Sequence, residues 1–172
     1  SGLVHHADPD CKPLVEAMLR GDFGLIIGHN VAFDMAVLAA FYPDLRPLIF
    51  EAYNRDGVTC TMLRQQLIDI AEGVMRGFVA RDGTWMKHRY NLGYVAHRHR
   101  CNVQPNKEDE FRLQYGQWRD VPLDQWPIGA KTYPVDDAKA TLEVYQKQGG
   151  AYVPDEYERA RAFFATQLMS VW

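Results

Sequence analysis

The sequence predicts one helix-rich α/β domain, and three observations support this fold class. The apolar run Phe-Gly-Leu-Ile-Ile-Gly at residues 23–28 indicates a short buried strand. Apolar and polar residues alternate on both sides of Asp82-Gly83, which is typical of a β-hairpin. Several longer stretches carry apolar residues at helical spacing. The length of 172 residues is sufficient for one domain with a sizeable core.

The elements predicted for the first half follow one another closely. A helix is predicted over residues 8–20, because Asp-Pro is a common helix start, and the strand follows it. The next helix begins at about Val31, and residues 44–53 predict a further short helix. Residues 59–73 predict an amphipathic helix that a glycine closes. Five apolar residues fall on one side of that helix: Met62, Leu63, Leu67, Ile70 and Ala71.

The second half is predicted to contain the hairpin and more helices. Two stretches are helix candidates: residues 91–100 and 108–116. Residues 121–134 predict a loop with one short helical turn. Pro134 then restarts a helix that runs to about Lys147, where two glycines follow. A last amphipathic helix is predicted over residues 155–172, with Asp155 as its cap.

Composition and charge exclude several classes of protein. The net charge is −3, so any nucleic-acid site must be a local patch rather than the whole surface. Three cysteines without Cys-x-x-Cys spacing argue against a disulfide framework and indicate a reducing cytoplasm. No apolar run approaches the length of a membrane span, so no membrane partner is expected.

Asn30 and Asp34 stand where the predicted strand passes into the next helix. Both have a structural interpretation, because asparagine caps helices and acids are favourable in the first turn. However, α/β proteins bind ligands at the C-terminal ends of strands, which is where Asn30 lies. With Phe33, these residues form an Asn-x-x-Phe-Asp pattern. A ligand site is therefore the alternative to helix capping.

Tyr133 and Asp137 form a second pair of candidate site residues. They are four residues apart, so they share one face if the segment is helical. A phenol and a carboxylate side by side can orient a water molecule and hold a cation. The alternative is a solvated helix start, at which acids complement the helix dipole.

Together, the two motifs resemble one family. The stretch GHNVAFDMAVL at residues 28–38 is similar to the second motif of the proofreading 3′–5′ exonuclease domain of family A, phage-type DNA polymerases, in the tyrosine-type DEDD group. The stretch YPVDDAKATLEVY at residues 133–145 resembles the third motif, and TCTMLRQQL at residues 59–67 falls at the family's Asp-Thr-x-x-Leu segment. The resemblance covers residues 24–172 and implies a ribonuclease-H-like exonuclease fold.

The resemblance also implies a mechanism, namely two-metal hydrolysis at the 3′ end of single-stranded DNA with Mg²⁺ or Mn²⁺. Asp34 would help to bind the second metal and Asp137 the first, while Tyr133 would orient the attacking water. Asn30 would support the site or the terminal nucleotide, and Phe33 would pack beside it. The natural protein would be either a DNA polymerase, with a polymerase module in the same chain, or a stand-alone phage exonuclease. It would act in the cytoplasm of a bacterium or a phage-infected cell.

The family's first motif, Asp-x-Glu on the central strand, does not occur in this sequence. Because that motif supplies two carboxylates to the metal site, the chain is expected to be a fragment that lacks the N-terminal strands. Truncation is expected at both ends, with residues 155–172 as the start of a linking helix toward the polymerase module. The alternative is a catalytically degenerate domain that acts as a DNA-binding or interaction module. In either case the chain alone is expected to be a weak or inactive nuclease.

A basic segment follows the predicted hairpin. Residues 87–100 contain four Lys or Arg and three His but no acid, with tyrosines between them. Tyr94, Arg98 and Arg100 are therefore candidates for a single-stranded DNA track, with cations on phosphates and rings under bases. A solvated helix face with tyrosines in the core is the alternative. A zinc site is not favoured, because His97 and Cys101 lack a second ligand pair at suitable spacing.

Overall fold

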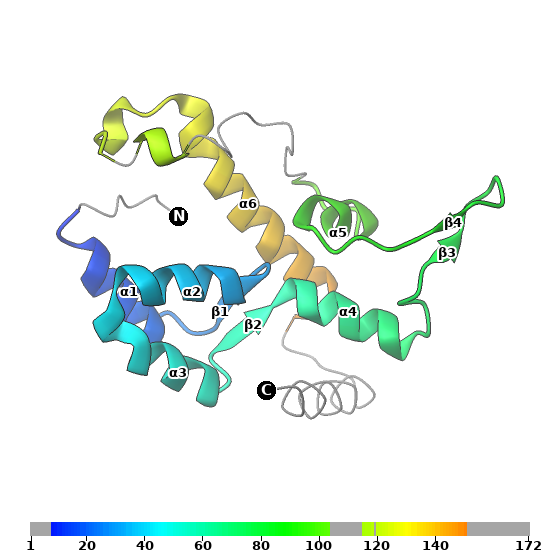
Figure 1. The fold of residues 1–172 in the computed structure, drawn as a ribbon, viewed down its shortest axis with the longest axis horizontal. Helices are drawn as coiled ribbons and strands as arrows, with labels where there is room; N and C mark the ends of the chain where they lie inside the picture. The colour runs from blue at the N-terminus through cyan, green and yellow to red at the C-terminus, as the bar shows by residue number, and fades with distance from the viewer. Residues whose placement is uncertain (1–7, 104–114, 119, 151–172) are drawn as a thin grey trace.

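The computed structural model describes residues 8–103, 115–118 and 120–150 (Figure 1). These ranges contain six α-helices and four short strands. In chain order they are α1 (Cys11–Arg20), β1 (Ile26–Gly28), α2 (Val31–Phe41), α3 (Arg46–Asn54), β2 (Val58–Cys60), α4 (Thr61–Ala71), β3 (Phe78–Val79), β4 (Trp85–Met86), α5 (Leu92–Arg98) and α6 (Ile128–Lys147). The helix-rich α/β class predicted from the sequence is confirmed. None of the described helices is long and apolar enough to cross a membrane.

Two parallel strands, β1 and β2, form the centre of the first half of the fold. Ile26 lies opposite Val58, and Gly28 lies opposite Cys60. The β-branched residues of both strands suit this extended conformation. Helices α1, α2 and α3 lie together beside the strands (Figure 1). They enclose a core of buried residues: Leu19, Val31, Met35, Leu45, Ile49, Ala52 and Cys60.

The sequence does not predict β2. This strand has only three residues, which is too short to show a hydrophobic period. A turn between α3 and β2 precedes the strand. In this turn Asp56 has a left-handed φ of 57°, and the Gly57 N–H donates to the Ala52 carbonyl at 2.8 Å. The strand forms because β1 offers an edge to which it can hydrogen-bond, and that partner is distant in sequence.

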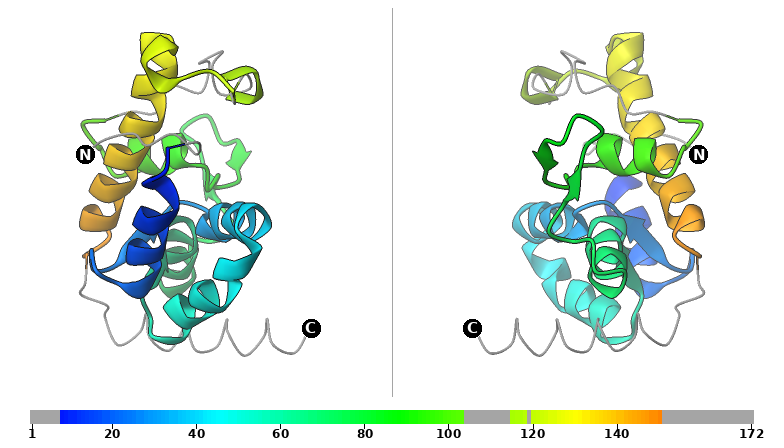
Figure 2. Two further views of the ribbon diagram at one scale, coloured as in Figure 1. Left: turned by 90° about the vertical axis from the view of Figure 1, so that its left-hand side faces the viewer. Right: turned by 90° about the vertical axis from the view of Figure 1, so that its right-hand side faces the viewer.

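The second half of the fold consists of α4, α5, α6 and the hairpin. A second core joins α5 to α6 and contains Val95, Ala96, Cys101 and Val144, with Leu92 packed against it. Helix α6 also contacts β1 and α4, so it connects the two halves. Figure 2 shows α6 passing beside α5. The predicted hairpin is confirmed, since β3 pairs antiparallel with β4.

Helix α6 begins six residues before the predicted start at Pro134. Pro127 has an extended backbone, with φ −53° and ψ 148°, and the helix starts immediately after it at Ile128. Pro134 lies inside the helix. A proline removes one hydrogen-bond donor there, but the flanking turns and the packing of α6 carry the helix through it.

The buried face of α4 also differs from the prediction. Leu63 and Ala71, which were expected on the apolar side, are exposed. Polar residues are buried instead: Thr61, Arg64, Gln65 and Asp69. The predicted helices at residues 108–116 and 155–172 lie outside the described residues, apart from a short 3₁₀ helix at Tyr115–Trp118.

Candidate functional site

An open pocket of about 830 Å³ lies between the end of β1, the first turn of α2, the start of α5 and the middle of α6. Five of the residues predicted for the site line this pocket: Asn30, Phe33, Asp34, Tyr133 and Asp137. His29 and the segment Tyr90–Gly93 form further parts of the wall. The structure therefore brings the two sequence motifs together at one cleft, as the resemblance implies.

A tight turn after β1 presents Asn30 to the pocket. Residue 28 has to be glycine, because a Cβ atom there would lie 2.7 Å from the Cβ of Val31. Asn30 has a left-handed backbone, with φ 61° and ψ 40°, a conformation that asparagine adopts more easily than most residues. Its side chain makes no capping hydrogen bond to α2. Asn30 thus occupies the N-cap position of α2 without a side-chain cap, and the exposed residue lines the pocket.

Phe33 and Asp34 occupy the first turn of α2 and are both exposed toward the cleft. The Phe33 side chain keeps 65% of its surface accessible, so its ring is available to a ligand. The protein around Asp34 partly desolvates its carboxyl group and thereby raises its pKa above the ordinary value. An exposed ring beside a carboxyl group is suited to a ligand with a flat apolar part and a polar part.

Tyr133 and Asp137 reach the same pocket from α6. Because α6 begins at Ile128, Tyr133 lies inside the helix rather than at its cap. The spacing of four residues therefore places both side chains on one face, as predicted. Both residues are half-buried. The pocket thus has acids on two walls, one from α2 and one from α6.

His29 also lines the pocket, although its sequence context predicts no role for it. Its Nδ1 lies 2.9 Å from Thr61 Oγ1, and its Nε2 lies 2.8 Å from the carbonyl oxygen of Tyr90. Because a carbonyl can only accept, Nε2 carries a proton and donates. Burial lowers the pKa of His29. The ring joins the end of β1 to α4 and to the segment before α5. In the sequence, only its position between Gly28 and Asn30 indicates that it belongs to the pocket.

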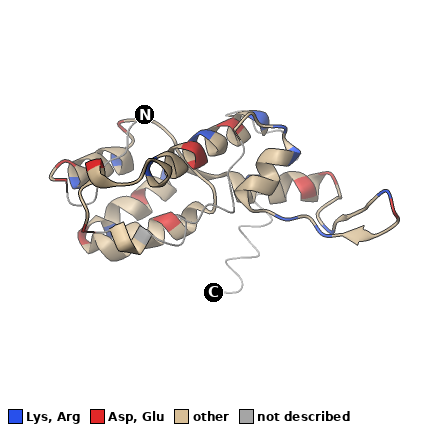
Figure 3. Ribbon diagram, turned by 90° about the horizontal axis from the view of Figure 1, so that it is seen from above, with Lys and Arg blue, Asp and Glu red and all other residues tan. Residues whose placement is uncertain are grey.

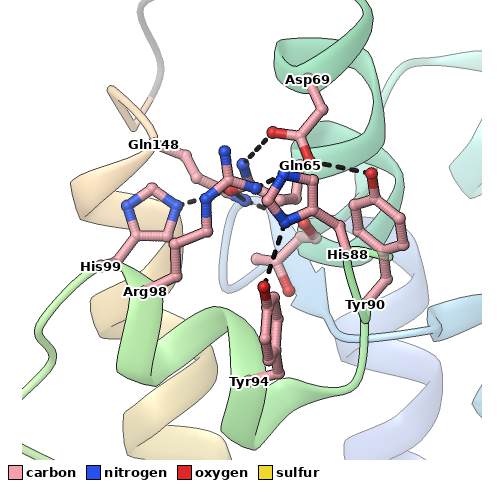
Figure 4. Close-up of polar contacts among 9 residues, drawn as sticks. Gln65, Asp69, His88, Tyr90, Tyr94, Arg98, His99 and Gln148 are labelled. Atoms are coloured by element: carbon pink, nitrogen blue, oxygen red, sulfur yellow. Dashed lines mark hydrogen bonds and ion pairs between the residues drawn. The ribbon is translucent and has the colours of Figure 1, made fainter. Parts of the chain in front are cut away.

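A buried polar network centred on Asp69 adjoins the pocket through Tyr90 (Figure 4). The Asp69 carboxylate is fully buried and accepts three hydrogen bonds. Tyr90 donates from its hydroxyl at 2.8 Å, Arg98 from its guanidinium at 2.7 Å and Gln65 from its amide at 2.9 Å. Burial alone would raise the pKa of Asp69, but these donors outweigh it and hold the pKa below the ordinary value.

Gln65 extends this network to the C-terminal end of α6. Its Oε1 accepts from His99 Nε2 at 2.5 Å and from the Gln148 amide at 3.1 Å (Figure 4). The same Gln148 amide donates to the Thr61 carbonyl at 2.9 Å. Burial, reinforced by the nearby charge of Arg98, lowers the pKa of His99. Helices α4, α5 and α6 are therefore joined by one chain of polar contacts.

The three residues predicted for the DNA track do not line the pocket. Arg98 is engaged with Asp69, and its side chain is only 27% exposed. The hydroxyl of Tyr94 lies 3.0 Å from Nδ1 of His88. Arg100 is exposed, two residues beyond the end of α5. The cations of the basic segment at residues 87–100 thus differ in their surroundings. Arg98 pairs with Asp69 and stabilises the fold, whereas Arg100 is exposed.

We expect the folded chain to lose stability when the pH falls from 7.5 to 5.5. Burial lowers the pKa values of His29 and His99 in the folded state, so the unfolded state binds more protons below about pH 6.5. The free energy of unfolding therefore decreases on acidification. A further decrease is expected below about pH 4, because the pKa of Asp69 is also lower in the folded state. Urea unfolding at a series of pH values measures this dependence.

The matched variants are His29→Gln, His99→Gln and His97→Gln. The first two are expected to reduce the loss of stability between pH 7.5 and 5.5, because each removes one buried titrating group. His97 is exposed on α5, and its variant is the surface control with which the other two are compared. Stability of the unsubstituted chain that does not change across this range would contradict the expectation.

The residues of the pocket do not by themselves fit the two-metal site that the resemblance implies. Asp34 and Asp137 are the two carboxylates in the pocket wall. In the described part of the chain, no group of three His, Cys, Asp or Glu is arranged to hold an ion. Hard cations such as Mg²⁺ and Mn²⁺ take more oxygen ligands than these two acids provide. We therefore assign no reaction step to a metal.

No protein-family model, curated protein or solved structure matches this chain.

Proposed function

We propose that this chain is a proofreading-type 3′–5′ exonuclease domain of ribonuclease-H-like fold. Its pocket receives the 3′ end of single-stranded DNA. The observation that carries this proposal is the pocket itself, because Asn30, Phe33 and Asp34 from α2 meet Tyr133 and Asp137 from α6 there. These segments lie far apart in the sequence, and each resembles a motif of the same family.

Each pocket residue has a role in this proposal. The exposed Phe33 ring offers a flat face to the terminal base, since aromatic side chains stack on unpaired bases. Asn30 supplies an amide for the sugar or phosphate of the terminal nucleotide. Tyr133 orients the water molecule that attacks the phosphodiester. Asp34 and Asp137 are the acids that correspond to metal ligands in the family, which uses Mg²⁺ or Mn²⁺.

A second candidate function is a DNA-binding or interaction module without catalysis. It is favoured by the small number of acids in the pocket, since no cluster of three possible ligands occurs in the described ranges. Single-stranded DNA is the ligand in both cases, and a polymerase module in the same natural chain is the proposed partner. The two functions differ in whether bound DNA is cut.

Phe33→Ala is expected to weaken the binding of single-stranded DNA about tenfold, because base–aromatic stacking contributes about 1–3 kcal/mol per base. Phe33 is exposed, so its truncation should leave the fold intact. The measurement is the fluorescence anisotropy of a 5′-labelled linear oligothymidylate, titrated with the full 172-residue chain in EDTA.

The matched control is Phe50→Ala. The Phe50 side chain on α3 is exposed to a similar degree, at 68% against 65% for Phe33, but it does not line the pocket. Phe50→Ala is expected to bind the oligonucleotide as the unsubstituted chain does. Equal affinities of the two variants would remove the support for a terminal-nucleotide site in this pocket.

A further inference from the structure

The β3–β4 hairpin extends away from the helices and exposes large apolar side chains on both strands (Figure 1). Among them are Phe78, Val79, Trp85 and Met86. A two-stranded hairpin by itself is marginally stable in water. Such a concentration of exposed apolar surface marks a site of interaction in soluble proteins.

The two faces of the hairpin are not equivalent. Directly opposed residues of an antiparallel pair project to the same face, so Phe78 shares a face with Met86, and Val79 with Trp85. The Phe78 ring lies 5.1 Å from the His88 ring, which directs the first face toward the chain near α5. Val79 and Trp85 remain 63% and 55% exposed. The Val79–Trp85 face is therefore the free face.

The hairpin is also positively charged. Its residues 74–89 contain four cations, namely Arg76, Arg81, Lys87 and Arg89, and all four are exposed. One acid, Asp82, lies at the tip, where its carboxylate accepts from the Thr84 N–H at 3.0 Å. Figure 3 shows basic residues, in blue, along the extended hairpin. The segment therefore carries a net charge of about +3, within a chain whose net charge is −3.

We propose that the free face of this hairpin binds single-stranded nucleic acid, with an unpaired base stacked on Trp85 and with phosphates on the surrounding cations. An exposed indole next to basic side chains is the combination that sequence-independent single-strand binders use. The charged tip, Arg81-Asp82-Gly83, argues against insertion into a lipid bilayer, which would need an apolar tip. The strands have two residues each, which is too short for a ribbon that reads a duplex groove.

This surface is separate from the pocket but leads toward it. Trp85 and Met86 are followed by Lys87, His88 and Arg89, and the next residue, Tyr90, lines the pocket. A strand bound along the hairpin would thus continue in the direction of the pocket. The hairpin contacts need no 3′ terminus, so this proposal does not depend on the function proposed for the pocket.

The test uses a circular single-stranded oligothymidylate, which has no 3′ end, and the full chain. Trp85→Ala is expected to weaken binding of the circle about tenfold, and Trp85→Phe, which keeps a ring, should retain most of the affinity. Arg81→Gln combined with Lys87→Gln is expected to reduce the slope of log affinity against log salt by about 1.4, or about 0.7 for each phosphate that the chain no longer neutralises. Lys12→Gln with Arg20→Gln on α1, at the opposite end of the molecule in Figure 1, is the control and should bind as the unsubstituted chain does.

Two results would overturn the proposal. One is equal affinity of all these variants and of the unsubstituted chain for the circle. The other is no binding of the circle by the unsubstituted chain, and binding to anionic phospholipid vesicles in that case would identify a membrane as the partner. Failure of the pocket proposal looks different, since it would appear as equal affinity of the chain for linear and circular DNA.

Discussion

Asp69→Ala is expected to lower the free energy of unfolding by about 3 kcal/mol or more. The carboxylate is fully buried and accepts hydrogen bonds from Gln65, Tyr90 and Arg98. Removing one partner of a buried ion pair leaves an uncompensated charge and typically costs about 3–5 kcal/mol. The partial exposure of Arg98 moves the expectation to the lower end of this range. Since the total free energy of unfolding of a small domain is about 5–15 kcal/mol, this loss is large.

Urea unfolding followed by circular dichroism measures this change. The matched control is Asp136→Ala, because Asp136 also contacts a cation, Lys139 at 3.3 Å, but both side chains are about half exposed. Exposed pairs contribute little, so a change within about 0.5 kcal/mol is expected there. A similar small effect for both substitutions would show that the Asp69 network does not stabilise the fold.

The Asp69 network also connects stability to the pocket. Tyr90 donates to Asp69 from its hydroxyl and accepts from His29 through its carbonyl, while the same residue lines the pocket. The tyrosine therefore holds one pocket wall against the buried carboxylate. A ligand that contacts this wall would therefore meet a segment that is held in place by Asp69 of α4, which Arg98 of α5 also contacts.

Local rules predict where each pair of site residues lies, and the resemblance to one family predicts that the two pairs meet. Asn30 and Asp34 are placed by the end of a buried strand, which the apolar run before them indicates. Tyr133 and Asp137 are placed by helical spacing. These two rules concern each segment alone, and the contact of α6 with β1 is what brings all four residues to one pocket.

The features that could not be predicted depend on contacts between distant segments. Residues such as Gln65 and Asp69 look like a solvated helix face until Arg98, Tyr90 and Gln148 are known to lie against them. The short strand β2 has no period of its own and forms on the edge of β1. Arg98 is predicted from the sequence to bind DNA, but it forms an ion pair with Asp69. Sequence spacing does not reveal this distant partner.

We expect the purified 172-residue chain to cut single-stranded DNA at least about a thousandfold more slowly than an exonuclease with a complete set of acids. The resemblance assigns four metal-binding carboxylates to the family, and this sequence supplies two, Asp34 and Asp137, without an Asp-x-Glu triplet. By the same resemblance these two acids serve different metals, so neither ion would have its full set of ligands. Residues that act as one catalytic unit are non-additive, and the loss of half of them removes most of the rate.

The assay follows the release of label from 3′-labelled single-stranded DNA with Mg²⁺ or Mn²⁺, using the chain and its Asp137→Ala variant. Equal, slow release by both proteins is expected, because Asp137 with Asp34 cannot replace the Asp-x-Glu carboxylates that this sequence does not contain. Rapid release that Asp137→Ala abolishes would contradict the expectation. It would show that another acid near the N-terminus, such as Asp8 or Asp10, completes the site, and it would decide between the two proposed functions in favour of the enzyme.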